Sequence, residues 1–389
     1  MTSQPLADSL LFSPLRLRGV DFPNRIVISP MCQYSAVDGM AQRWHHVHLG
    51  KLAAGGAGTV MVEASAVEER GRITCGDTGA WSDAHLGSLR AMAETIQAFG
   101  AVPAIQLGHA GRKASSQRPW HGNVALTEAD RQTSGDTAWQ TVSSSDLPLS
   151  DGWPAPRALA ENELHDICDA FAAAARRAAS AGFRMIELHS AHGYLLHQFL
   201  SPLANQRSDA YGGDFEGRMR FPLEVAQAMR RALPDDVVMS VRISSVDGLE
   251  GGWQLSDSIE YSRRLKALGV DLIDCSSGGI GGSATMAAAS PYAVKRGPGF
   301  QVPFADAVRR EADIATIAVG LIVHGAQAEA VLRAGSADLI AIGREALYNP
   351  NWPLHAARAL GIDPQFSAWP KQYGWWLARR PDVEAMLKA

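Results

Sequence analysis

Short, continuously apolar runs recur along the chain, and each ends in small or polar residues. Continuous rather than alternating apolarity is typical of parallel strands that are buried on both faces. The predicted strands are Arg25–Pro30, Gly58–Ala64, Val102–Gly108, Met185–Ala191, Val237–Ser244, Leu272–Ser277, Ala315–Gly320 and Leu339–Arg344.

Between these runs, apolar residues recur at helical spacing. Several of these segments end in glycine, which supplies the left-handed cap after a last helical turn. The predicted helices are Trp44–Ala54, His85–Phe99, Asn162–Ala181, Arg220–Leu233, Ser256–Leu268, Phe304–Glu311, Ala326–Arg333 and Trp352–Leu360. Eight strands alternating with eight helices predict an α/β fold, a (β/α)8 TIM barrel, in one domain over residues 1–389; a doubly wound open sheet is the alternative.

Two segments depart from this alternation. Leu15–Val20 alternates apolar and polar residues and breaks at a glycine, which predicts an N-terminal hairpin, interpreted as a plug under the barrel. Ala110–Glu161 links the third strand to its helix through about fifty residues rich in Ser, Asp, Trp and Pro. This long loop leaves the catalytic face of a barrel, so it is interpreted as a partial lid, with an irregular surface excursion as the alternative.

Composition narrows the possible partners. The 389 residues carry a net charge of −4, which argues against nucleic acid or an anionic membrane surface as a partner. No run approaches the roughly 18 apolar residues of a membrane span, and Met1–Asp8 lacks the features of a signal peptide. The four cysteines, Cys32, Cys75, Cys168 and Cys275, show no Cys-x-x-Cys spacing. A cytoplasmic protein without a disulfide scaffold or an iron–sulfur site is therefore expected.

The segment Glu187–Pro202 holds the strongest candidate chemistry. It places His189, His192 and Tyr194 where a buried strand gives way to a loop, a common position for reactive side chains. Two imidazoles three residues apart can converge on one small group, and a phenol two residues further on can supply a proton to it.

Other strand ends contribute an amide, a cation, a thiol and a second phenol. They provide Ser29 to Tyr34, Glu63-Ala64, Gln106, Arg242, Gly278-Gly279, Gly320 and Gly343-Arg344. No cluster of Asp or Glu accompanies the histidines, which disfavours a hydrolytic metal site. The glycines and Arg344 at the last two strands offer bare N–H groups and a guanidinium, which predict a phosphorylated ligand.

Several motifs in order resemble the old yellow enzyme family of FMN-dependent ene-reductases. They are Ser29-Pro30-Met31-Cys32-Gln33-Tyr34, Gln106 in Ile-Gln-Leu-Gly-His-Ala-Gly-Arg, His189-Ser-Ala-His192-Gly-Tyr194 and Arg207-Ser-Asp-Ala-Tyr-Gly-Gly. The Cys32/Tyr34 opening and the Gly343-Arg344 ending resemble its thermophilic-like branch, the group of YqjM and xenobiotic reductase A.

This resemblance implies a bound FMN that is reduced by NADPH or NADH. Residues Ser29, Pro30, Met31 and Cys32 are expected along the flavin. The other implied cofactor contacts are Ala64 at the ring, Gln106 at the pyrimidine edge, Arg242 at the N1/O2 end, and Gly320, Gly343 and Arg344 at the phosphate.

The resemblance also implies a reaction on an activated alkene such as an enone, an enal or a maleimide. His189 and His192 are expected to bind the carbonyl oxygen, and Tyr34 to help hold the substrate. Hydride passes from the reduced flavin to the β-carbon, and Tyr194 protonates the α-carbon. Cys32, near the redox face, is expected to tune the flavin potential.

The chain departs from the family pattern at two positions that concern substrate preference and the subunit contact. Arg296 stands where xenobiotic reductase A has an aromatic wall, and Trp375 stands where YqjM-like members place an arginine that reaches the neighbouring subunit. Adjacent Trp375 and Trp376 predict a contact surface in a homodimer or homotetramer; packing against their own barrel is the alternative.

Two other functional classes remain open at this stage. A metal-dependent barrel hydrolase would use His189 and His192 as ligands, and a flavin-binding redox sensor would respond through Cys32. The run His45, His46 and His48 is interpreted as helix-surface or packing residues, with a metal site as the alternative.

Overall fold

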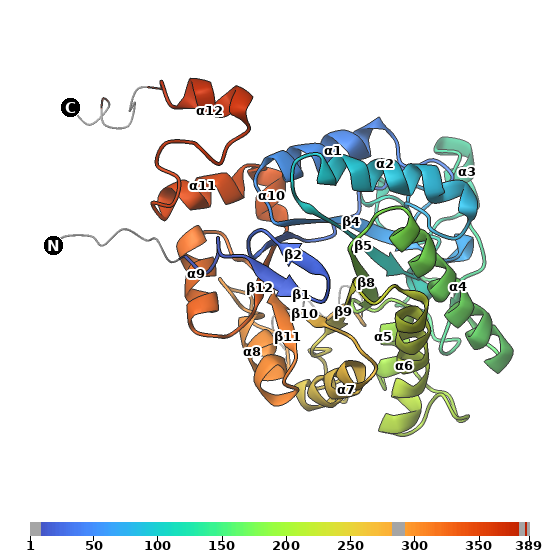
Figure 1. Ribbon diagram of the computed structural model, residues 1–389. Helices are drawn as coiled ribbons and strands as arrows, with labels where there is room; N and C mark the ends of the chain where they lie inside the picture. The colour runs from blue at the N-terminus through green and yellow to red at the C-terminus, as the bar shows by residue number, and fades with distance from the viewer. Residues whose placement is uncertain (1–8, 282–291, 381–385, 387–389) are drawn as a thin grey trace.

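Eight parallel strands close into a barrel at the centre of the molecule (Figure 1). The computed structural model describes residues 9–281, 292–380 and 386. The strands are β3 (Ile26–Ile28), β4 (Thr59–Ala66), β5 (Val102–Gly108), β8 (Met185–Ser190), β9 (Val238–Ser244), β10 (Leu272–Ser276), β11 (Ala315–Ala318) and β12 (Leu339–Ile342). Because β12 pairs with β3, the sheet has no open edge, and the predicted barrel is confirmed over the open sheet.

Helices surround the barrel in the order that the sequence predicts. They are α1 (Arg43–Ala54), α2 (Leu86–Gln97), α4 (Glu161–Ser180), α6 (Phe215–Ala232), α7 (Leu255–Ala267), α8 (Val302–Glu311), α9 (Gly325–Arg333) and α11 (Trp352–Ala359). Helix α6 begins at Phe215 rather than at Arg220, because the Asp214 side chain caps it by accepting a hydrogen bond from Gly217 N at 2.8 Å. Among the described residues, no helix has both the length and the apolar character that crossing a membrane requires.

Four short helices were not predicted from the sequence. They are α3 (Glu128–Thr133), α5 (Leu195–Leu200), α10 (Arg344–Tyr348) and α12 (Lys371–Leu377). Helices this short carry too few periodic positions for a pattern to appear. Helix α12 lies outside the ring of barrel helices, beyond α11 (Figure 1).

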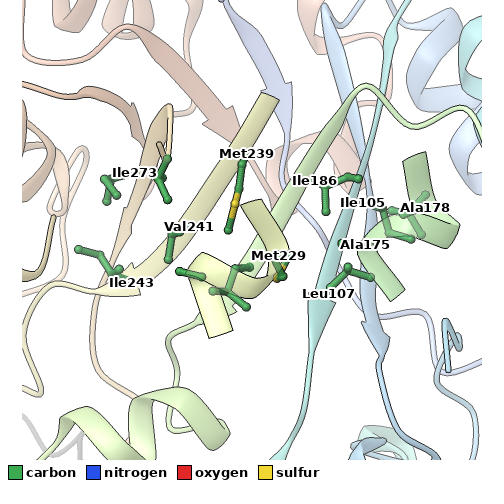
Figure 2. Close-up of a cluster of buried hydrophobic side chains, with 14 of the residues drawn as sticks. Ile105, Leu107, Ala175, Ala178, Ile186, Met229, Met239, Val241, Ile243 and Ile273 are labelled. Atoms are coloured by element: carbon green, nitrogen blue, oxygen red, sulfur yellow. The ribbon is translucent and has the colours of Figure 1, made fainter. Parts of the chain in front are cut away.

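The main core lies between the strands and the helices. Figure 2 shows Ile105 and Leu107 of β5 beside Ala175 and Ala178 of α4, and all four are buried. Small alanines on the helix let its backbone approach the bulky strand side chains closely. This packing holds the strands, and therefore their carboxyl ends, in fixed positions.

A hairpin closes the amino-terminal mouth of the barrel. Strands β1 (Leu15–Leu17) and β2 (Val20–Phe22) pair antiparallel, and the buried side chains of Val20 and Phe22 enter the barrel interior. There they join apolar residues from all eight barrel strands: Val27, Met61, Val102, Ala104, Met185, Val238, Leu272, Ile317, Leu339 and Ala341. The interpretation of this hairpin as a plug is confirmed.

The long loop after β5 is ordered and tied to the barrel. It contains three short 3₁₀ or α segments, at Gly111–Lys113, Pro119–His121 and α3, and a small sheet of β6 (Val142–Ser143) with β7 (Arg157–Ala158). Ser143 Oγ donates to Gln198 Oε1 at 2.8 Å, which anchors the loop on α5. These ties favour the lid over a loose surface excursion.

The plug should contribute strongly to stability. We expect Phe22→Ala to lower the free energy of unfolding by about 3–5 kcal/mol, because it removes a fully buried aromatic ring from a packed interior. The neighbouring Asp21→Ala serves as a control, since its pair with Arg16 is exposed and worth about 1 kcal/mol or less. Urea unfolding measures both, and equal losses from the two variants would contradict the plug.

Candidate active site

The barrel brings the predicted site residues to one mouth. In the strand register His189 lies opposite Arg242, Arg242 lies opposite Asp274, and Gln106 lies opposite Glu187. Gly320 follows β11, and Gly343 with Arg344 follows β12, at the same end of the barrel. Residues that are more than two hundred positions apart along the chain therefore converge on one site.

The two histidines form a pair with defined partners. Ala191 N donates to His189 Nδ1 at 3.2 Å, and His189 Nε2 lies 3.3 Å from His192 Nδ1. His192 Nε2 lies 2.7 Å from Ser276 Oγ. Burial, followed by the positive charge of Arg242, lowers the pKa of both imidazoles well below 6.5. Both rings are therefore neutral near pH 7.

Tyr194 completes this group. Its ring meets the ring of His189 edge to face, with centroids 4.8 Å apart. Burial, followed by the Coulombic effect of Cys32, raises the pKa of the Tyr194 phenol well above 10. The phenol keeps its proton at neutral pH and can donate it.

The loop that carries these side chains adopts an unusual backbone. His192 and Gly193 both have positive φ, 57° and 72°, and a Cβ on Gly193 would come within 2.3 Å of Gly279 O. Lys113 of the lid donates to His192 O at 2.7 Å and to Gly279 O at 2.6 Å. These two hydrogen bonds join the loop after β5 to the loop that carries His192 and to the segment after β10.

A buried acid–imidazole pair supports the same loop. Gly193 N donates to His197 Nδ1 at 2.8 Å, and His197 Nε2 lies 2.8 Å from Asp247 Oδ1. Asp247 Oδ2 accepts from Ser201 Oγ at 2.6 Å and from Trp253 N at 2.8 Å. Sequence reasoning missed Asp247, since nothing in the spacing links two residues fifty positions apart, one in α5 and the other in the loop after β9.

Two buried carboxyl groups lie in the barrel beside Arg242. Gln106 Nε2 donates to Glu187 Oε1 at 2.9 Å, Ser240 Oγ donates to Glu187 Oε2 at 3.1 Å, and Arg242 Nε lies 3.3 Å from Asp274 Oδ2. Burial and then the charge of Asp274 raise the pKa of Glu187 to about 8. Glu187 and Asp274 were not among the site residues predicted from the sequence. Strand periodicity was the missed signal, because Glu187 precedes the first histidine by two residues and shares its face.

Cys32 lies beside Tyr34 and Ala64, on the opposite side of the barrel from Arg242. Its thiol interacts with the Tyr34 side chain and with the backbone of Ala64. Burial, followed by the charges of Asp77 and Glu63, raises the pKa of the thiol well above 9. Cys32 is therefore a protonated thiol, a weak hydrogen-bond donor and not a nucleophilic thiolate.

Two adjoining cavities occupy the mouth. The larger, of about 500 Å³, is lined by Tyr34, His192 and Tyr194 together with lid residues that include Lys113 and Trp153. The second, of about 300 Å³, is lined by the glycines and the arginine after the last two strands. Residues shared by both cavities are His192, Ser277, Arg296, Phe300 and Gln301.

These cavities fit a phosphorylated flavin. Ser29 Oγ is buried and has no hydrogen-bond partner among the described residues, so it has capacity for a polar ligand, whereas Arg242 Nε makes no hydrogen bond there but lies 3.3 Å from Asp274 Oδ2. A Cβ built on Gly343 would approach nothing closer than Ser29, at 3.9 Å, so the backbone there is bare. Arg344 lines the same cavity with Gly320 and supplies a cation for a phosphate.

A metal site has no support in the described residues. They contain no group of three or more His, Cys, Asp or Glu side chains placed to hold a metal ion. His45 and His48 are buried in α1, and His46 Nδ1 lies 2.9 Å from Thr95 Oγ1. The interpretation of these histidines as packing residues is confirmed.

Fold and site together define a barrel oxidoreductase of the flavin class. The family described as NADH:flavin oxidoreductase / NADH oxidase matches residues 10–361, and the chain belongs to this family. The resemblance to the old yellow enzymes is confirmed, FMN is the cofactor, and NADPH or NADH is the reductant.

Relatives match over nearly their whole length. An NADPH dehydrogenase from Geobacillus sp. (strain WCH70) is 44% identical over 356 residues, which are 91% of this chain and 95% of the relative. One from Geobacillus thermodenitrificans is 41% identical over 95% of this chain and 99% of the relative. Morphinone reductase solved with tetrahydroNAD superposes with a TM-score of 0.70 at 26% identity, over 90% of this chain and 91% of that one.

Removing the charge of Asp247 should weaken the fold in a pH-dependent way. Burial alone raises its pKa, but His197 and the donated hydrogen bonds outweigh burial and bring the pKa below its usual 3.8. An acid with a depressed folded pKa stabilises the fold above its unfolded pKa, and this stability is lost as the pH falls. We expect Asp247→Asn to cost about 1.5–3 kcal/mol at pH 7 and less below about pH 4.

Urea unfolding of wild type and variant across pH measures this difference. Asp313→Asn is the control, because that carboxylate is exposed and should leave stability near that of the wild type. A stability loss that is independent of pH would show that the charge of Asp247 is not what holds the loop.

Proposed function

We propose that the protein is an FMN-dependent NAD(P)H ene-reductase that reduces activated alkenes such as enones, enals and maleimides. We also propose that a single barrel domain, residues 1–389, carries this activity. The observation that supports it best is the group of His189, His192 and Tyr194 on one cavity. Two neutral imidazoles and a protonated phenol are suited to bind an oxygen and to donate a proton beside it.

His189 and His192 would bind the carbonyl oxygen of the substrate. Their facing nitrogens are 3.3 Å apart, close enough for both to reach one oxygen atom. Hydrogen bonds to that oxygen withdraw electrons from the conjugated alkene and stabilise the negative charge that grows there in the transition state. Tyr34, on the wall of the larger cavity, would help hold the substrate.

Tyr194 would supply the proton. When bound and reduced, FMN would supply the hydride that the β-carbon of the alkene receives. The raised pKa of Tyr194 keeps its phenol protonated, so it can protonate the α-carbon, and the edge-to-face contact with His189 fixes its ring. Catalytic roles are therefore proposed for Tyr194, His189, His192 and, through tuning of the flavin potential, Cys32.

The cofactor contacts proposed from the family motifs agree with the free polar groups of the site. Ser29 Oγ has no hydrogen-bond partner among the described residues, and Arg242, beside Asp274, would stabilise negative charge at the N1/O2 end. The other proposed contacts are Pro30, Met31, Cys32, Ala64, Gln106, Gly320, Gly343 and Arg344.

Tyr194→Phe tests the proposal directly. We expect the reoxidation of the reduced enzyme by a cyclic enone to slow by roughly 10²–10⁴-fold, because general-acid catalysis is lost, while reduction by NADPH proceeds at the wild-type rate. Since the phenol stays protonated, the wild-type reoxidation rate should be flat between about pH 6 and about pH 9. Stopped-flow absorbance of the flavin measures both half-reactions.

Tyr261→Phe is the matched control, because it removes a buried phenol whose hydroxyl group lies 3.3 Å from Ser190 Oγ. An unchanged reoxidation rate in Tyr194→Phe would exclude Tyr194 as the proton donor. A colourless protein that cannot be reconstituted with FMN would contradict the function as a whole.

We also propose that the chain forms a homodimer or homotetramer through α12. Trp375 and Trp376 of this helix are 53% and 69% exposed, and Tyr373 beside them is 57% exposed. Exposed aromatic patches of this kind mark contact surfaces. The side chain of Arg379 lies 3.9 Å from the centroid of the Trp375 ring, which orients the patch.

Replacing both tryptophans by serine should reduce the assembly to monomers, because it removes the apolar anchors of the contact. Sedimentation velocity of the purified protein measures the change. Trp120→Ser is the control, since Trp120 is 61% exposed and belongs to the loop after β5 rather than to α12. An unaltered sedimentation coefficient in the double variant would place the contact elsewhere.

A further inference from the structure

A neutral imidazole carries one N–H, so its tautomer decides which nitrogen can donate. For His189 a backbone hydrogen bond determines the tautomer. Ala191 N–H donates to Nδ1, which must then carry the lone pair, and the proton lies on Nε2. His189 therefore presents an N–H donor toward His192.

His192 has two possible tautomers with opposite consequences. With its proton on Nε2, the ring accepts from His189 Nε2 across the 3.3 Å contact. In that state the Nε2–H group of His189 donates to His192, and the Nε2–H group of His192 faces Ser276. Neither ring then has an N–H group free to donate to a ligand. With its proton on Nδ1, the two N–H groups face the same point, and both are available to one ligand oxygen.

The hydroxyl group of Ser276 distinguishes these states. Ser276 Oγ lies 2.7 Å from His192 Nε2, a short contact for a hydroxyl donor. Its other acceptor is Gln301 Oε1 at 3.5 Å, which already accepts from Ser277 Oγ at 2.7 Å. The contact with His192 Nε2 is the shorter of the two, so it is the favoured direction for the hydroxyl proton of Ser276, and a proton donated there requires the imidazole proton to lie on Nδ1.

We propose that Ser276 is a positioning residue that holds His192 as the Nδ1–H tautomer, so that His189 and His192 present two converging N–H donors to one oxygen. This inference deepens the proposed function and rests on it for the identity of that oxygen as a substrate carbonyl. A site with two donors and no acceptor selects oxygens that offer lone pairs, such as a carbonyl or a phenolate.

The direct test is the tautomer of His192 in the FMN-bound enzyme. Nitrogen-15 NMR of histidine-labelled protein reports which ring nitrogen is protonated, and a His192→Gln variant assigns the signal. We expect an Nδ1–H signal in the wild type and in Ser276→Thr, which keeps a hydroxyl group. In Ser276→Ala the signal should shift to the Nε2–H form.

Ser245→Ala is the matched control. Ser245 is a buried serine whose backbone N donates to Ser276 O, and its own hydroxyl group has no hydrogen bond to His192 or Ser276 among the described residues. Removing that hydroxyl group should leave the tautomer of His192 unchanged. A shift in this variant equal to that in Ser276→Ala would mean that any buried truncation perturbs the ring, and would overturn the proposal.

A second measurement connects the tautomer to the oxygen site. Phenolate titrated into the oxidised holoenzyme, followed by the visible flavin spectrum, should bind about tenfold to a hundredfold more weakly in Ser276→Ala, as expected for losing one hydrogen bond to a charged oxygen. Affinity should be near wild type in Ser245→Ala and largely restored in Ser276→Thr, at equal FMN content.

The possible failures are distinguishable. An Nδ1–H signal that persists in Ser276→Ala overturns the role of Ser276, whatever the activity. A shifted tautomer with unchanged phenolate affinity also overturns it, because the second donor would then not reach the ligand. A wild type that binds no phenolate and reduces no enone contradicts the proposed function instead, while the NMR comparison still decides whether Ser276 holds the ring.

Discussion

Closure of the barrel between β12 and β3 is the constraint on which the site depends. Pairing of Ile340 with Ile26 and of Ile342 with Ile28 fixes the stagger of the strands, and Ser29 N continues the ladder by donating to Ile342 O at 3.0 Å. The first and last strands thus meet side by side. That contact places the Ser29 hydroxyl beside the bare backbone of Gly343, which neither segment could achieve alone.

Burial from water then determines the protonation states of the side chains at the mouth of the barrel. The same burial that keeps the imidazoles of His189 and His192 neutral keeps the phenol of Tyr194 and the thiol of Cys32 protonated. The site therefore holds a set of neutral donors beside the fixed cation Arg242. Such a set binds oxygens and supplies protons without carrying charges that would compete with a phosphorylated cofactor.

Most of the fold and much of the site could be predicted from the sequence. Buried parallel strands leave a continuous apolar signal, and glycine caps mark where helices end, so the barrel and the plug were both predicted. Helix α6 was placed to begin at Arg220, whereas the Asp214 cap sets its beginning at Phe215. The short α5 and α12 lay below the length at which a period can be recognised.

The sequence by itself determined which chemical groups stand at the strand ends, because the apolar runs fix where each strand stops and which residues follow it. Only the tertiary structure decided how those groups are paired. Whether His192 faces Ser276, whether Glu187 meets Gln106, and whether Asp247 supports Gly193 depend on strand register and loop docking. These contacts join residues far apart in the chain, and a hydrogen bond between them leaves no periodic trace in either segment.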